Sequence, residues 1–97
     1  MVQVNVKVHS ILREVVGRPS LVIEAQDDIS VGDVLSKVFY QFKDGFQQKY
    51  QMGEGDWDLL KHFIIALNGV LLPNPSGLNT NVKEGDVVDI MEPMAGG

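Results

Sequence analysis

The chain contains no cysteine, so its fold has no disulfide bond and no thiol on which it could hold an acyl group. It also lacks an N-terminal basic stretch followed by an apolar run, the pattern of a secretory signal peptide. Its apolar runs are far shorter than the ~18 residues that a membrane-spanning helix needs. We therefore expect a cytoplasmic protein that does not enter a membrane.

Basic residues are few as well. Eight Lys and Arg stand against 13 Asp and Glu, which leaves a formal net charge of -5 at pH 7. Binding to nucleic acid and docking on an anionic membrane both need clustered positive charge, so we expect neither. A protein partner with a basic surface fits this charge better, because opposite fields accelerate encounter.

The sequence has no recognisable ligand set for metal or acid–base chemistry. Its two histidines, His9 and His62, are far apart, whereas zinc needs three or four converging ligands. The carboxylates at 27–28 and at 84–86 lie beside turn and helix-start signals, which explain them without catalysis. We expect no metal site, and ordinary surface or rim positions for both histidines.

The patterns that are present indicate one α+β domain over residues 1–97, of which 44% are hydrophobic. Residues 2–8 alternate valine with polar residues, which predicts a strand with one buried face. Residues 10–18 form a connection with Gly17 as a turn signal, and residues 20–25 predict a second strand, antiparallel to the first.

A helix is predicted to begin after Ser30, a good N-cap residue with Asp33 three positions on. We expect it to end before Asp44-Gly45. Residues 44–62 are interpreted as a long excursion with one short helix near 56–62, where Trp57 either packs over the main helix or contacts a partner. Apolar residues at helical spacing form a stripe that can cover a sheet: Val31, Val34, Leu35, Val38, Phe39 and Phe42.

The second half predicts three more strands, at 63–67, 70–72 and 87–91. Asn68-Gly69 between the first two is a strong β-hairpin signal, because both turn positions need positive φ. Leu78 is expected to plug the core from a loop.

Together these elements predict a mixed sheet of four or five strands, with the first and last strands side by side in its centre and the helix on one face. The opposite face has apolar candidates at Val22, Ile64 and Leu71. This face is either a partner surface or is covered by the 44–62 excursion.

The chain ends without periodicity over residues 92–97 and closes on Gly96-Gly97. At ordinary glycine usage, a terminal Gly-Gly arises by chance about once in 200 chains. Glycine has no side chain to obstruct a narrow channel, so the carboxylate of Gly97 can approach a reacting group closely. We interpret 92–97 as a flexible reactive tail; the alternative is an ordinary frayed end.

Three features in this order resemble the MoaD/ThiS sulfur-carrier family of the ubiquitin-like (β-grasp) fold. They are the opening strand followed by Leu12-Arg13-Glu14, the Asn68-Gly69 hairpin, and the run from Glu84 through Val88 to the Gly-Gly end. The family comprises the small subunit of molybdopterin synthase and the thiamine-pathway sulfur carrier. The Leu-Arg-Glu segment and Pro93 look more like the molybdopterin member. Residues 44–62 depart from the compact members of the family.

The resemblance implies that Gly97 is adenylylated by an ATP-dependent activating enzyme and then converted to a thiocarboxylate by a sulfur donor protein. The large subunit of molybdopterin synthase would receive the tail, with Pro93, Met94 and Ala95 in contact with the partner and Gly96 beside the reactive end. The chain would bind no cofactor and act as a co-substrate or non-catalytic subunit rather than a self-contained enzyme. Two alternatives stay open: a modifier joined to lysines through Gly97, and a thiamine-pathway carrier. A binding module with an inert tail is a third.

Overall fold

The computed structural model describes residues 1–9, 11–50, 63–73 and 76–91. The strands, in chain order, are β1 (Val2–Val8), β2 (Ser20–Ala25), β3 (Ile64–Leu67), β4 (Val70–Leu71) and β5 (Val87–Met91). The helices are α1 (Ile11–Val16), α2 (Val31–Gln41), α3 (Lys43–Tyr50) and the 3-10 helix η2 (Ser76–Asn79).

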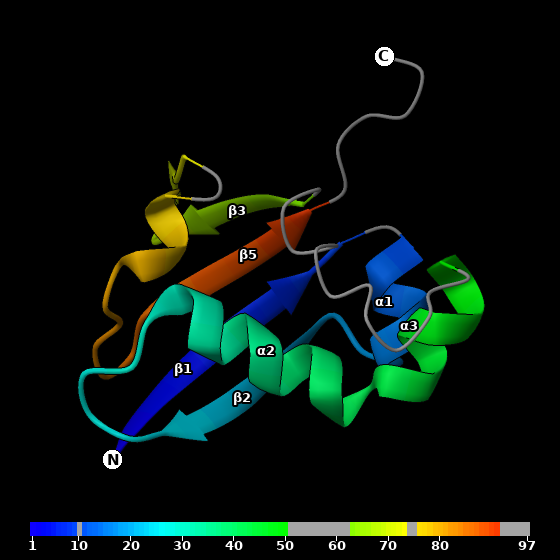
Figure 1. The fold of residues 1–97 in the computed structure, drawn as a ribbon, viewed down its shortest axis with the longest axis horizontal. Coiled ribbons are helices and arrows are strands. Elements are labelled where there is room, and N and C mark those ends of the chain that lie inside the picture. Colours follow the sequence, from blue (N-terminus) through cyan, green and yellow to red (C-terminus); the bar gives the residue numbers. More distant parts are fainter. Residues whose placement is uncertain (10, 51–62, 74–75, 92–97) are drawn as a thin grey trace.

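The five strands form one mixed sheet in the order β2-β1-β5-β3-β4 (Figure 1). β1 and β5 pair in parallel at its centre, from Asn5 beside Val87 to Val8 beside Ile90. β2 pairs antiparallel with β1, and β3 pairs antiparallel with both β5 and β4. The predicted central pairing of the first and last strands is confirmed. The α+β fold is a ubiquitin-like β-grasp.

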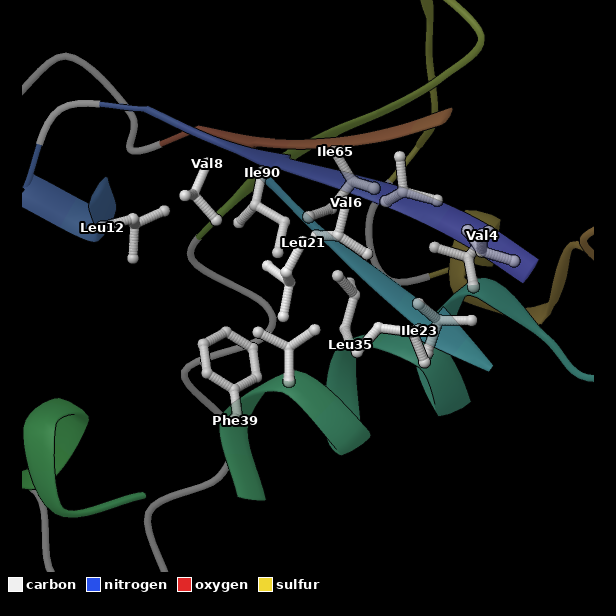
Figure 2. Packing of buried hydrophobic residues seen from close by; sticks show 14 of the residues in the cluster. Val4, Val6, Val8, Leu12, Leu21, Ile23, Leu35, Phe39, Ile65 and Ile90 are labelled. Carbon is white, nitrogen blue, oxygen red and sulfur yellow. The ribbon is translucent and has the colours of Figure 1, made fainter. Parts of the chain in front are cut away.

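One face of the sheet, called here the inner face, packs against α2 (Figure 2). The alternation along β1 puts its even-numbered valines into this core, and the helical stripe of α2 meets them. A capping box starts α2: the Asp33 N–H donates to Ser30 Oγ at 3.1 Å, and the Ser30 N–H donates to Asp33 Oδ2 at 3.3 Å. The predicted start of the helix is therefore confirmed.

The excursion at 44–62 begins differently from the prediction, because α3 follows α2 after a break at Phe42. Phe46 of α3 is 1% exposed and meets the ring of Phe39 edge-on, with 4.4 Å between ring centroids. Gly45 allows α3 to approach α1, since a Cβ there would lie 2.9 Å from Val15 Cγ1. Trp57 and the expected helix at 56–62 lie outside the described residues.

Smaller differences concern the connections. The segment interpreted only as a link after β1 contains the helix α1. Leu78 packs partly buried against the core, as predicted, but from η2 rather than from a loop. The hairpin prediction is confirmed by positive φ values of 52° at Asn68 and 85° at Gly69.

Candidate functional site

The predicted site residues, Gly96 and Gly97 with Pro93, Met94 and Ala95, lie outside the described residues, as does the whole tail 92–97. The structure does describe the point from which the tail continues, Met91 at the end of β5. The site is therefore built from that point outward.

Met91 ends a central strand. It pairs with Ile64 of β3, and the residue before it, Ile90, pairs with Val8 of β1 and Ile65 of β3. Ile90 is 1% exposed in the core, so both hydrogen-bond ladders and side-chain burial hold this end of β5. The root of the tail is thus fixed to a strand that is paired on both sides.

The face of the sheet away from α2, called here the outer face, carries apolar side chains near this root. Ile64 is 39% exposed and Leu71 is 66% exposed, and Met91 is half-buried beside them. Val22 is also exposed, on the far edge strand β2. All three predicted candidates for this patch are therefore exposed.

The described part of the 44–62 excursion does not lie over that patch. Helix α3 contacts α1 and α2, which belong to the inner side of the sheet and its end (Figure 1). Residues 44–50 therefore do not cover the outer face, and the rest of the excursion, 51–62, lies outside the described residues.

On the β1 side of Met91, the outer face carries polar side chains instead. His9 Nε2 lies 2.9 Å from Asp89 Oδ1, and the pair is part-buried. His9 is thus a rim histidine, as expected, but it has a partner 80 positions away that the sequence offered no signal to find. Lys7 lies in register with Asp89 on the same face.

The acidic residues singled out in the sequence at 84–86 have structural roles at the opposite end of β5. Asp86 accepts from the Lys83 N–H at 2.7 Å and from Asn68 Nδ2 at 3.0 Å, while Glu84 accepts from the Gln3 N–H. Asn68 Oδ1 accepts the Val87 N–H at 2.8 Å, which ties the hairpin to the start of β5. These contacts explain the carboxylates without chemistry.

Two further features concern the whole described chain. No group of three or more His, Cys, Asp or Glu within it could hold a metal ion. Among the same residues, no helix has both the length and the apolar character needed to cross a membrane.

Most of the chain, including the residues after Met91, is similar to known proteins. A model of the ThiS family matches residues 6–97, which include the end of β1, the other four strands and the terminal glycines. The chain belongs to the ThiS family. This membership confirms the resemblance that the strand, hairpin and Gly-Gly patterns indicated.

Relatives of this ThiS-family chain are named either as small archaeal modifier proteins or as subunits of a molybdopterin-converting factor. Small archaeal modifier protein 3 of Haloferax volcanii is 30% identical over 95 residues, 98% of this chain and 99% of the relative. The solution structure of small archaeal modifier protein 1 from Methanosarcina acetivorans is 28% identical with a TM-score of 0.75, covering 100% of this chain and 98% of that one.

A third similar structure is a complex of subunits 1 and 2 of the molybdopterin-converting factor from Helicobacter pylori. It is 27% identical with a TM-score of 0.57, and the match covers 98% of this chain and 99% of that one. Small archaeal modifier proteins and a molybdopterin-converting factor subunit are thus both found among the proteins this chain is similar to.

Proposed function

We propose that this chain is a sulfur carrier, the small subunit of a molybdopterin synthase, and that it carries sulfur as a thiocarboxylate on Gly97. The observation that supports this most is the family match that runs through the terminal glycines. The similar chain from Helicobacter pylori belongs to a complex of molybdopterin-converting factor subunits, which favours this pathway.

The proposed chemistry begins with activation, because a carboxylate is a poor electrophile. An oxygen of the Gly97 carboxylate attacks the α-phosphorus of ATP in a partner enzyme, and pyrophosphate leaves. The outer sulfur of a persulfide on a donor protein then attacks the acyl carbon, AMP leaves, and an acyl disulfide joins the chain to the donor. A second thiol of the donor protein attacks the donor's sulfur in that bond, so that a disulfide forms on the donor and the thiocarboxylate is released. Its sulfur is then passed to a pterin precursor in the large subunit.

In this proposal the chain binds no cofactor; ATP is bound and consumed by the activating enzyme. The chain contributes a rigid base and a side-chain-poor end. The six residues after Met91 can span at most about 20 Å when extended, enough to place a carboxylate inside a partner while the sheet stays at its surface. Because the activating step uses ATP, the proposal places the chain in the cytoplasm.

The outer face beside Met91 is the proposed contact for these partners. Ile64 exposes apolar area beside Met91, where the tail begins, and Leu71 exposes more on β4, two strands away from β5. A partner that takes the tail must approach this end of β5, and apolar area here would be buried in the complex.

The test is the intact mass of the chain purified from its native host under conditions of cofactor synthesis. We expect a fraction heavier by the exchange of one oxygen for sulfur, and loss of that fraction when Gly96 and Gly97 are deleted. A terminus that never carries sulfur, beside a functional synthase, would overturn the proposal. Unchanged function after the deletion would instead support an inert tail.

A second candidate is a protein modifier, favoured by the 30% identical relative named as a small archaeal modifier protein. The same acyl adenylate would be attacked by a lysine amine, with AMP leaving and an isopeptide bond forming. Trypsin cleaves after lysine and arginine, and Lys83 is the last such residue of this chain. Digested host proteins should then yield lysines that carry residues 84–97 as a branch ending in Gly-Gly. A co-purifying thiazole synthase would point to the thiamine pathway instead.

A further inference from the structure

β2 is an edge strand, and no described residue pairs with its free side. It pairs with β1 from Ser20 to Ala25 and lies at one border of the sheet (Figure 1). At the other border, β4 is only two residues long and Pro73 follows closely, which are two devices that protect an edge from further pairing. β2 has six residues in unbroken register, without lysine, proline or bulge, and its one charged residue, Glu24, accepts from Gln3 of β1. β2 is therefore the less protected edge of the sheet.

The hydrogen bonds of β2 leave alternate main-chain groups pointing away from the sheet. The Val8 N–H donates to the Pro19 carbonyl at 3.0 Å, which makes these residues a hydrogen-bonded pair of the β1–β2 ladder. Such pairs recur at every second residue of an antiparallel ladder, so the odd-numbered residues of β2 turn their N–H and C=O groups toward β1. The main-chain groups of Ser20, Val22 and Glu24 therefore point outward, and among the described residues they have no hydrogen-bond partner.

The three outward-pointing residues are complementary to the same three residues of a second copy of the chain. In an antiparallel pair centred on Val22, this residue faces its own copy, and Ser20 faces Glu24 of the second copy. Each facing pair can then exchange both of its main-chain hydrogen bonds. Val22 is 56% exposed, so the central pair also buries apolar area, and the serine hydroxyl can donate to the glutamate.

The charges at the two ends of β2 favour the antiparallel orientation. Arg18, before the strand, is exposed and forms no ion pair with another described residue. Asp27 and Asp28, after the strand, are exposed as well. An antiparallel copy places Arg18 of each chain beside the acidic end of the other, twice over because the pair has two-fold symmetry. A parallel copy would instead bring like charges together at both ends.

We propose that two copies of this chain pair edge to edge through β2, antiparallel and centred on Val22, as a reversible dimer. The inference does not depend on the proposed function. The two-fold axis is perpendicular to the joined sheet, so both α2 helices lie on the same side and the two β5 strands run in opposite directions. Because β1 separates β2 from β5, the contact leaves Met91 of each copy clear, and the two tails begin at opposite ends of the dimer.

Sedimentation equilibrium of the full-length chain, from micromolar to millimolar concentration, measures the dissociation constant. One strand per copy is a small interface, so we expect a wild-type value of roughly 100 μM. Val22→Lys places two like charges opposite each other at the centre of the pair and should raise the dissociation constant about tenfold. The matched control is Val70→Lys, at a 64% exposed position on the other edge strand, β4, which should leave the constant unchanged. Neither change removes a buried side chain, so denaturation should show both variants folded.

Two further sets of variants test the orientation and the register. Arg18→Glu should weaken the dimer, and adding Asp27→Arg should restore much of the affinity, because opposite charges then meet again. The chain has no cysteine of its own, so single cysteines report which residues face each other. Val22→Cys should give a disulfide-linked dimer under mild oxidation, whereas Glu24→Cys, which faces Ser20 of the second copy, should not.

A wild type that stays monomeric at millimolar concentration would overturn the inference. Equal dissociation constants for Val22→Lys and Val70→Lys would also overturn it, as would a dimer that only Val70→Lys weakens, since the contact would then lie on β4. These measurements need neither an activating enzyme nor sulfur. Failure of the dimer therefore leaves the proposed function standing, and a Gly97 that never carries sulfur leaves the dimer standing.

Discussion

The inner and outer faces of the same sheet differ in how deeply their apolar side chains are buried. On the inner face, the apolar side chains of β1 from Val4 onward, of β2 and of β5 are at most 7% exposed and form one core with α2. On the outer face, Val22, Ile64 and Leu71 are 39% to 66% exposed, and no described element covers them. The inner face therefore accounts for stability, whereas the outer face has features that stability does not explain. Substitutions that separate folding from partner binding test this contrast.

The largest effect is expected for Phe39→Ala. Phe39 is 1% exposed and contacts the rings of Phe46 and Phe63, so the substitution removes buried area and leaves a cavity where three aromatic side chains meet. We expect the free energy of unfolding to fall by about 3–5 kcal/mol. Chemical denaturation measures it. The neighbouring Tyr40, 78% exposed, is the matched control, and Tyr40→Ala should change stability by less than about 0.5 kcal/mol.

A middle-sized effect is expected for Asp86→Ala, at the end of the sheet away from the tail. The change removes the acceptor of the Lys83 N–H and of Asn68 Nδ2. Because the site is partly exposed and water can replace the carboxylate, we expect a loss of about 1–2 kcal/mol. Asp27→Ala is the control, since the ion pair of Asp27 with the N-terminus is exposed and 3.6 Å long. Equal losses for both variants would contradict the assigned role of Asp86.

Ser30→Ala tests the start of α2 and is expected to cost about 1 kcal/mol, because the Asp33 N–H loses its acceptor. Thermal unfolding of the full chain measures it. Ser30→Thr should retain most of the stability, since the threonine hydroxyl can also accept the Asp33 N–H and donate to Asp33 Oδ2. An equal loss of stability in both variants would show that the Ser30 side chain stabilises the fold by packing and not by capping α2.

The smallest effect on folding and a clear effect on binding are expected for Leu71→Ser on the outer face. Leu71 is 66% exposed, so the free energy of unfolding should change by less than about 0.5 kcal/mol. Affinity for the activating enzyme, measured by titration calorimetry, should fall, because the substitution removes apolar area from the outer face that is proposed to contact this partner. Unchanged affinity would exclude Leu71 from the proposed contact.

Much of the inner face was predictable because its signals are local. The valines of β1 at every second position and the Ser30–Asp33 pair each lie within one element, so period and capping identify them. The start of α3 was missed because Gly45 resembles a helix terminator. The glycine is there because α1 leaves no room for a Cβ, a contact between segments about thirty residues apart.

By itself, the sequence determined the strands, the main helix, the hairpin turn and the Gly-Gly ending, because each depends on neighbouring residues and on backbone preferences that are local. Only the tertiary structure decided what surrounds the root of the tail. The parallel pairing of β1 with β5 brings Lys7 and His9 beside Asp89, and the β3–β5 pairing brings Ile64 beside Met91. These contacts join residues far apart in the chain, so chain folding creates them and no local pattern records them.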